Sequence, residues 1–197
     1  MPGRGNPNAV RVWSQIDVYA AEQDTDAPLQ EDFYEEPNEA VWDLVGLISA
    51  EQAPTWTPEQ EVNKIYVHGG ALVRSSLSKQ AITAQFTPVE NNHVVWELAN
   101  PGSDAVTTGD ITERTVRPRN IGLANRAFLI DFFDGSIKLR RFIPSGQAMM
   151  LDAQTFGEAA EMATPITVDT LLSLDEDDES YFYRDWTDDP AAVVSAS

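Results

Sequence analysis

The sequence contains no cysteine, two histidines and only 13 basic residues among 197. Without cysteine, neither a disulfide framework nor thiolate chemistry at a metal or substrate is available. His68 and His93 have no second metal ligand at a diagnostic spacing, so we expect ordinary surface or partly buried imidazoles. No apolar stretch approaches the length of a membrane span, and residues 1–13 lack the apolar core of a signal peptide. These absences predict a soluble protein, made in the cytoplasm and not inserted in a membrane.

Recognised catalytic motifs are also missing. The chain has no Gly-x-Ser-x-Gly elbow, and Gly69 and Gly70 are not followed by the lysine and helix of a phosphate loop. The acidic run at residues 175–179 lacks the alternating ligands and central glycine of a calcium loop, so we expect a solvated turn there. Weak divalent cation binding at this turn stays open. We therefore expect no enzyme, no catalytic residue, no cofactor and no bound metal.

Acidic residues dominate the charge of the chain. Their number is 32, which gives a formal net charge of −19 and an isoelectric point near 4.2. Such a surface repels phosphates, so nucleic-acid or lipid binding through a basic footprint is disfavoured. The negative charge is consistent with a role in solubility or with adaptation to a saline host. It is also consistent with a surface that lies close to nucleic acid without binding it. Composition alone does not choose between these interpretations.

The remaining composition predicts one β domain. A length of 197 residues with 42% hydrophobic residues supports one substantial core. We expect a flexible arm over residues 1–9, a single domain over residues 10–186 and a tail over residues 187–197. Within the domain, β-branched and alternating stretches predict strands. These stretches are residues 10–21, 41–48, 62–67, 72–77, 81–87, 104–118, 166–174 and 181–186.

Three connecting or ambiguous segments have their own signals. Residues 22–38 are acidic and predict a solvated loop whose Phe33 and Tyr34 form either a packing anchor or a partner contact. Residues 53–61 hold two prolines around Trp56, which predicts an extended loop carrying an exposed aromatic side chain. Residues 145–161 fit either a strand or a short helix.

The clearest hairpin lies at residues 125–143. Two strand-like runs flank Asp134 and Gly135, a dipeptide that favours a tight two-residue turn. Arg140 and Arg141 fall on opposite faces of the second strand, so at least one should be exposed or paired with a carboxylate.

One helix is predicted, at about residues 88–99. Thr87, Pro88 and Glu90 have the spacing of a capping box, and apolar residues then recur at helical intervals. Asn100 and the following proline and glycine end the helix. The chain thus predicts a strand that leads into one amphipathic helix covering a sheet.

These patterns together resemble the major tail tube protein of long-tailed (siphovirus-type) bacteriophages infecting actinobacteria. The resemblance extends over roughly residues 41–186 and rests on five segments in order. The segments are VWDLVGLISAEQAPTW at 41–56, ITAQFTPVE at 82–90, VVWELANPG at 94–102, AFLIDFFDGSIKLRRFIP at 127–144 and ITVDTLLSL at 166–174.

The resemblance implies a fold and an assembly. The expected fold is mainly β, a β-sandwich or half-barrel with one flanking helix, an extended N-terminal arm, a long inter-strand loop and a C-terminal tail. The expected function is structural: hexameric rings stack into a hollow tube, part of the virion, through which the genome passes. Expected partners are further copies of the chain, the tape measure protein, the tail terminator, distal tail or baseplate proteins, and double-stranded DNA that passes without sequence-specific binding.

The resemblance also nominates residues. We expect residues 52–70 to reach the adjacent ring, and the arm and tail to cross between subunits. Acids facing the bore would repel DNA phosphates. The candidates are Trp56, Glu59, Tyr66 and His68 for ring stacking, Arg4 and Asn8 for the arm, and Asp131 and Asp134 for the bore.

The sequence is also compatible with two other functions. A capsid decoration protein or head-to-tail connector shares the composition and the virion context. A non-viral β-sandwich that binds a carbohydrate or small ligand would be a stable monomer with an aromatic-lined cleft.

Overall fold

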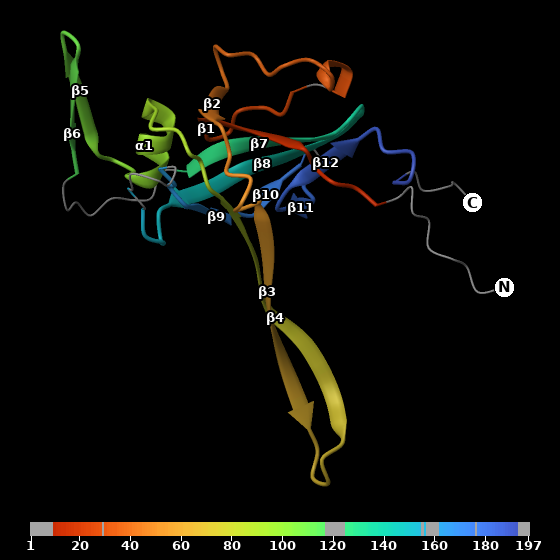
Figure 1. The fold of residues 1–197 in the computed structure, drawn as a ribbon. Coiled ribbons are helices and arrows are strands. Elements are labelled where there is room, and N and C mark those ends of the chain that lie inside the picture. The colour runs from red at the N-terminus through yellow and green to blue at the C-terminus, as the bar shows by residue number, and fades with distance from the viewer. Residues whose placement is uncertain are drawn as a thin grey trace.

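A computed structural model describes residues 10–28, 30–116, 125–154, 156, 162–175 and 177–192. The described chain is mainly β and contains one short α-helix, which confirms the expected fold class (Figure 1). Eight strands form the main sheet, and all their pairings are antiparallel. These strands are β1 (Gln15–Glu22), β2 (Asp43–Gly46), β3 (Thr55–Tyr66), β4 (Leu72–Phe86), β7 (Asn125–Asp134), β8 (Ile137–Met149), β9 (Ile166–Thr170) and β12 (Arg184–Thr187).

The sheet divides at β8. Its strand order is β2-β1-β7-β8-β9-β4-β3, and β12 also pairs with β8. Residues 139–142 of β8 pair with β12, whereas residues 146–149 pair with β9. The long strand β8 therefore joins the β12 branch to the branch that ends in β4 and β3.

Hydrophobic side chains cover both faces of the sheet centre. Val18, Phe128 and Ile130 are fully buried in the main core, as the alternation in residues 10–21 and 125–134 predicts. On the opposite face, Trp42 and Phe142 belong to a second cluster. Strand β7 is consequently buried on both faces.

The predicted hairpin at residues 125–143 is confirmed. Strands β7 and β8 pair up to Asp134 and Ile137, so the two turn residues are Gly135 and Ser136, one position later than expected. Gly135 has φ +62°, a left-handed conformation that glycine adopts without a Cβ clash. Within the ambiguous segment 145–161, β8 continues as far as Met149.

Helix α1 (His93–Ala99) begins five residues later than predicted. Its N-cap is Asn92, whose Oδ1 accepts a hydrogen bond from the Val95 amide at 2.9 Å. Thr87 is buried, and its carbonyl oxygen accepts from the Ser49 amide at 2.8 Å. The predicted capping box is therefore wrong, because residues 87–89 run as extended chain beside residues 47–49. The predicted end at Asn100 is confirmed.

Several expected strands are shorter or divided. Residues 104–115 form a hairpin of β5 (Asp104–Thr108) and β6 (Ile111–Thr115) instead of one strand. After β9, the short strands β10 (Ser173–Leu174) and β11 (Ser180–Tyr181) enclose the acidic turn. Residues 41–48 are only half-buried, since Leu44 and Leu47 are exposed. The acidic loop contains one short 3-10 helix, η2 (Gln30–Asp32).

Candidate functional site

The most prominent feature outside the sheet body is the hairpin of β3 and β4, which extends away from the rest of the molecule (Figure 1). The prediction of a loop at residues 53–61 is wrong, because β3 begins at Thr55 and pairs along its whole length with β4. Pro58 fits this strand because β3 is the last strand of the sheet, where a missing amide donor leaves no partner unsatisfied. At about 3.3 Å per residue, a strand of this length spans roughly 40 Å.

The outer part of this hairpin, residues 62–79, is called the hairpin tip below. Its large apolar side chains are all exposed, although strands of this composition are ordinarily buried on at least one face. They are Val62, Ile65, Tyr66, Val67, Leu72, Val73 and Leu77. The tip therefore has no core of its own in a single subunit.

The hairpin tip also differs from the rest of the chain in charge. It carries Lys64, Arg74 and Lys79 and contains no acidic residue, within a chain of net charge −19. Lys79 lies 3.2 Å from Glu59 in the inner part of the hairpin. Neither Lys64 nor Arg74 forms an ion pair with another described residue. The tip is thus both apolar and basic.

Of the four stacking candidates, three lie exposed on this hairpin and one does not. Glu59, Tyr66 and His68 are exposed. Trp56 instead packs against the core: its ring lies 5.6 Å from the Phe132 ring, and the Arg141 guanidinium lies 4.5 Å from its centroid. The expectation of an exposed Trp56 is wrong, because the inner half of β3 is part of the sheet.

A second surface feature is a groove of about 340 Å³ beside β1 and β2. Four carboxylates and several apolar side chains line this surface, which is called the acidic groove below. The acids are Asp17, Glu36, Glu39 and Asp43, and the apolar members include Tyr19 and Leu44. None of these four acids forms an ion pair with another described residue.

Burial affects the ionisation of two groove residues. It raises the pKa of Asp17, and the nearby Asp131 and Glu36 carboxylates raise it further, against a hydrogen bond from Gln15. Burial, together with the Asp17 carboxylate, also raises the pKa of Tyr19 to about 12. The four carboxylates therefore give the groove a negative electrostatic potential. In this environment the ionised form of Asp17 is disfavoured.

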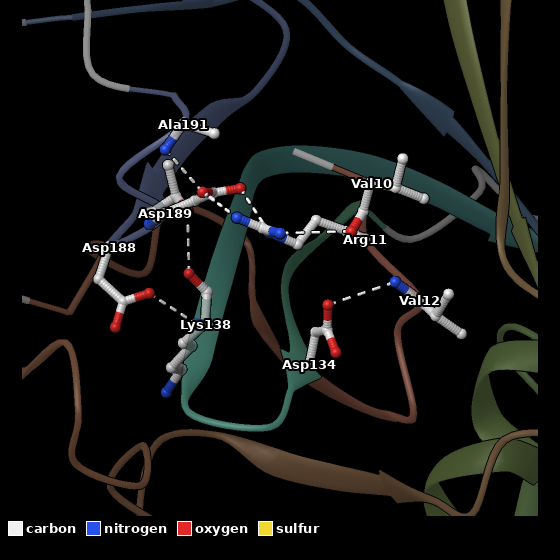
Figure 2. A network of polar contacts seen from close by, with 9 residues as sticks. Val10, Arg11, Val12, Asp134, Lys138, Asp188, Asp189 and Ala191 are labelled. Atoms are coloured by element: carbon white, nitrogen blue, oxygen red, sulfur yellow. Dashed lines mark hydrogen bonds and ion pairs between the residues drawn. The ribbon is translucent and has the colours of Figure 1, made fainter. Parts of the chain in front are cut away.

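Asp131 does not face a bore in this subunit. It is 2% exposed and accepts hydrogen bonds from Arg140, while the Lys138 ammonium lies 2.8 Å from its Oδ2. Asp131 is therefore not available as the bore-facing acid that was expected, because both faces of β7 are covered. Asp134 is half-buried, and its Oδ2 accepts from the Val12 amide at 3.4 Å (Figure 2).

The two ends of the described chain are joined by an ion pair. Arg11 donates to both carboxylate oxygens of Asp189, and Figure 2 shows this contact beside the start of β8. The hydrogen bond from Arg11 lowers the pKa of Asp189. Asp188 accepts from the Lys138 amide at 2.8 Å. Ordered contacts thus continue into the expected tail beyond Trp186, whereas residues 1–9, with Arg4 and Asn8, and residues 193–197 lie outside the described residues.

Other predicted features have local explanations. Arg140 and Arg141 both pair with carboxylates, as expected; Arg141 donates to both oxygens of Asp185 at 2.7 Å. Phe33 is a packing anchor, with the Lys138 ammonium 5.4 Å from its ring centroid. His93 lies 3.2 Å from Glu97 on the helix surface.

The acidic turn accepts hydrogen bonds from its own backbone. Asp175 Oδ1 receives the amides of Asp177 and Glu179 at 3.0 and 2.8 Å. Within the described residues, no group of three or more acidic or histidine side chains could hold a metal ion. No helix of the described chain is long and apolar enough to cross a membrane.

Residues 52–70 were expected to reach the adjacent ring, but sequence reasoning missed the basic, acid-free character of the hairpin tip and missed the acidic groove. The tip had a readable signal, since residues 62–79 form an acid-free stretch with three basic residues in a strongly acidic chain. The groove had none, because its acids come from β1, from β2 and from the loop between them.

Comparison with known proteins gives a family match, which extends over almost the whole chain. The sequence profile of one family, described as phage tail tube protein, matches residues 4–193. No match is found among curated proteins.

Proposed function

The chain belongs to the phage tail tube protein family, and from this premise we propose that it forms hexameric rings that stack into the hollow tail tube of a long-tailed phage infecting actinobacteria. Membership of the family makes the chain a structural component of the virion tail that assembles with other tail proteins. The ring symmetry, the type of phage and its host are our proposal.

The observation that carries the proposal is the exposed, apolar hairpin tip. An isolated two-stranded hairpin is marginally stable in water, and contiguous exposed apolar surface of this kind marks an interaction site. Tyr66 is 57% exposed and Val73 is 63% exposed, so both leave apolar area open to a neighbour. Projecting from the end of the sheet, the tip would contact an adjacent ring, with Glu59, Tyr66 and His68 on the exposed part of the hairpin.

The net charge suits a conduit for DNA. A bore lined with carboxylates repels phosphates, so double-stranded DNA would pass without sequence-specific binding during genome delivery. Asp131 is excluded from this role by its burial, and Asp134 remains a candidate. The arm with Arg4 and Asn8 would cross between subunits.

The assembled tube would meet other proteins at its ends and in its bore. We propose the tape measure protein inside, the tail terminator at one end, and distal tail or baseplate proteins at the other. Synthesis would take place in the host cytoplasm. The family match favours this role over a capsid decoration protein, a head-to-tail connector or a ligand-binding module.

A shortened hairpin tests the proposal. Glu61 pairs with Lys79, so replacing residues 62–78 by Asn-Gly should close the hairpin just outside the sheet body. We expect a folded monomer that forms no rods in negative-stain electron microscopy, under conditions in which the wild type forms them. Normal rods from the shortened chain would contradict the proposal.

Point variants separate the role of apolar contacts from that of hairpin length. Tyr66→Ser with Val73→Ser keeps the hairpin intact and should also abolish rods. The matched control is Leu151→Ser with Leu172→Ser, which removes side chains 67% and 59% exposed elsewhere on the surface. This control should assemble like the wild type. Equal loss of assembly in both double variants would contradict a specific role for the tip.

A further inference from the structure

We propose that the hairpin tip of one copy docks in the acidic groove of a neighbouring copy. The inference rests on the proposed function, because it names the surface that receives the tip within the tube. It is carried by the complementary charge and the shared apolar character of two surfaces at opposite ends of one sheet.

The charges of the two surfaces are opposite and locally uncompensated. Lys64 and Arg74 are exposed on a tip without acidic residues, and neither has an ionic partner among the described residues. The groove offers Glu36, Glu39 and Asp43, which also lack a described basic partner. Most other basic side chains of the described chain already contact a carboxylate or an aromatic ring. Among the described residues, the tip is therefore the main source of positive charge without an ionic partner.

Apolar contact accompanies the charges. Leu44 is 51% exposed at the groove, and Tyr19 lines its wall. Tyr66 and Leu72 pair across the tip and are 57% and 51% exposed. Covering these side chains removes apolar area from water on both partners. A tip that is only basic would bind weakly to surface acids, whereas this tip adds hydrophobic burial to the ion pairs.

The position of the two surfaces makes the contact intermolecular. The acidic groove lies at β1 and β2, which begin the sheet order, and the tip belongs to β4 and β3, which end it. Figure 1 shows the tip pointing away from the body, opposite the orange segment that leads into β2. A contact between two different surfaces on identical chains is heterologous, and it produces closed rings or open filaments. Tip-to-groove docking therefore adds a repeating contact suited to a tube.

Charge exchange tests the pairing. Lys64→Glu with Arg74→Glu, and separately Glu36→Lys with Glu39→Lys, should each raise the protein concentration needed for rod formation at least tenfold. The four substitutions in one chain restore opposite charges and should bring assembly back toward the wild-type concentration. Asp110→Lys with Glu113→Lys is the matched control, with the same charge change as the groove variant on the exposed β5–β6 hairpin, and should leave assembly unchanged. Rods from both reversed variants at the wild-type concentration, or no recovery in the fourfold variant, would overturn the docking proposal.

Covalent capture gives an independent readout. Because the chain has no cysteine, Tyr66→Cys with Leu44→Cys introduces the only thiols, one on the tip and one at the groove. Oxidation of assembled rods should give a ladder of dimers, trimers and higher species on a non-reducing gel, and neither single variant should extend beyond dimers. If the wild type forms rods but the oxidised double-cysteine variant gives no ladder, the docking proposal is overturned and the proposed function stands. A wild-type chain that forms no rods at all would overturn both.

Discussion

Asp131 and Arg140 lie opposite each other on β7 and β8 and form a buried, two-pronged ion pair. The Arg140 Nε and Nη2 atoms donate to the two carboxylate oxygens at 2.8 and 2.7 Å, and both residues are 2% exposed. Arg140 also donates to the carbonyl oxygens of Asp32 and Glu35. The pair thus fixes the acidic loop around η2 against the sheet.

Removing the negative partner should destabilise the folded chain. Asp131→Asn leaves Arg140 and Lys138 as buried cations without their carboxylate, which ordinarily costs about 3–5 kcal/mol. We expect a loss of this size in the free energy of unfolding, measured by urea denaturation. The control Asp134→Asn removes a half-buried acid on the same strand and should change stability far less. An Asp131→Asn protein as stable as the wild type would contradict a structural role for the pair.

Asp17 should reduce stability at neutral pH. It lies opposite Asp131 in the register of β1 and β7, and its pKa is raised above the ordinary 3.8, mainly by burial. Between 3.8 and the raised value, the folded chain binds more protons than the unfolded chain, so the free energy of unfolding falls as pH rises through this window. Asp17→Asn removes the ionised group and should keep the contact with the Gln15 amide.

The pH dependence checks the sign of this effect. Asp17→Asn should melt at a higher temperature than the wild type at pH 7, and the difference should shrink as pH falls toward 3.8. Asp43→Asn removes an exposed acid at the same groove, serves as the control, and should change the melting temperature at pH 7 far less. An Asp17→Asn protein less stable than the wild type at pH 7 would contradict the argument.

A side chain at Gly46 should cost more stability than one at Gly70. It has φ +106°, and a Cβ there would lie 2.6 Å from the Glu90 Oε2 atom, whose carboxylate accepts from the Leu47 amide. Gly70 has φ +82° with open space around it. Gly70→Ala should therefore cost only the left-handed strain of about 1–2 kcal/mol, and Gly46→Ala should cost more. Equal losses in chemical denaturation would mean that the approach of Glu90 does not constrain Gly46.

Alternation along single strands made much of the sheet predictable. Ile16, Val18 and Ala20 share the core side of β1, and the turn after Asp134 joins β7 to β8. The helix start was not predictable, because the local capping signal at Thr87 competes with a long-range hydrogen bond to Ser49. The outcome depends on which distant segment packs beside residues 87–89, and the local sequence does not specify that segment.

The candidate site was predicted less well than the fold, for similar reasons. The prolines near Trp56 indicated a loop, but Pro54 precedes β3 and Pro58 fits the last strand of the sheet. Asp131 sits in a strand whose two faces are both covered, so a two-residue period cannot identify an exposed side. The groove acids meet only after β1, β2 and the loop between them are assembled.

Electron microscopy of the purified wild-type chain tests the central claim most directly. We expect long hollow rods of uniform diameter, formed by this chain alone, with sixfold symmetry in end views. A protein that stays monomeric at high concentration, or that forms only solid fibres or closed shells, would contradict it.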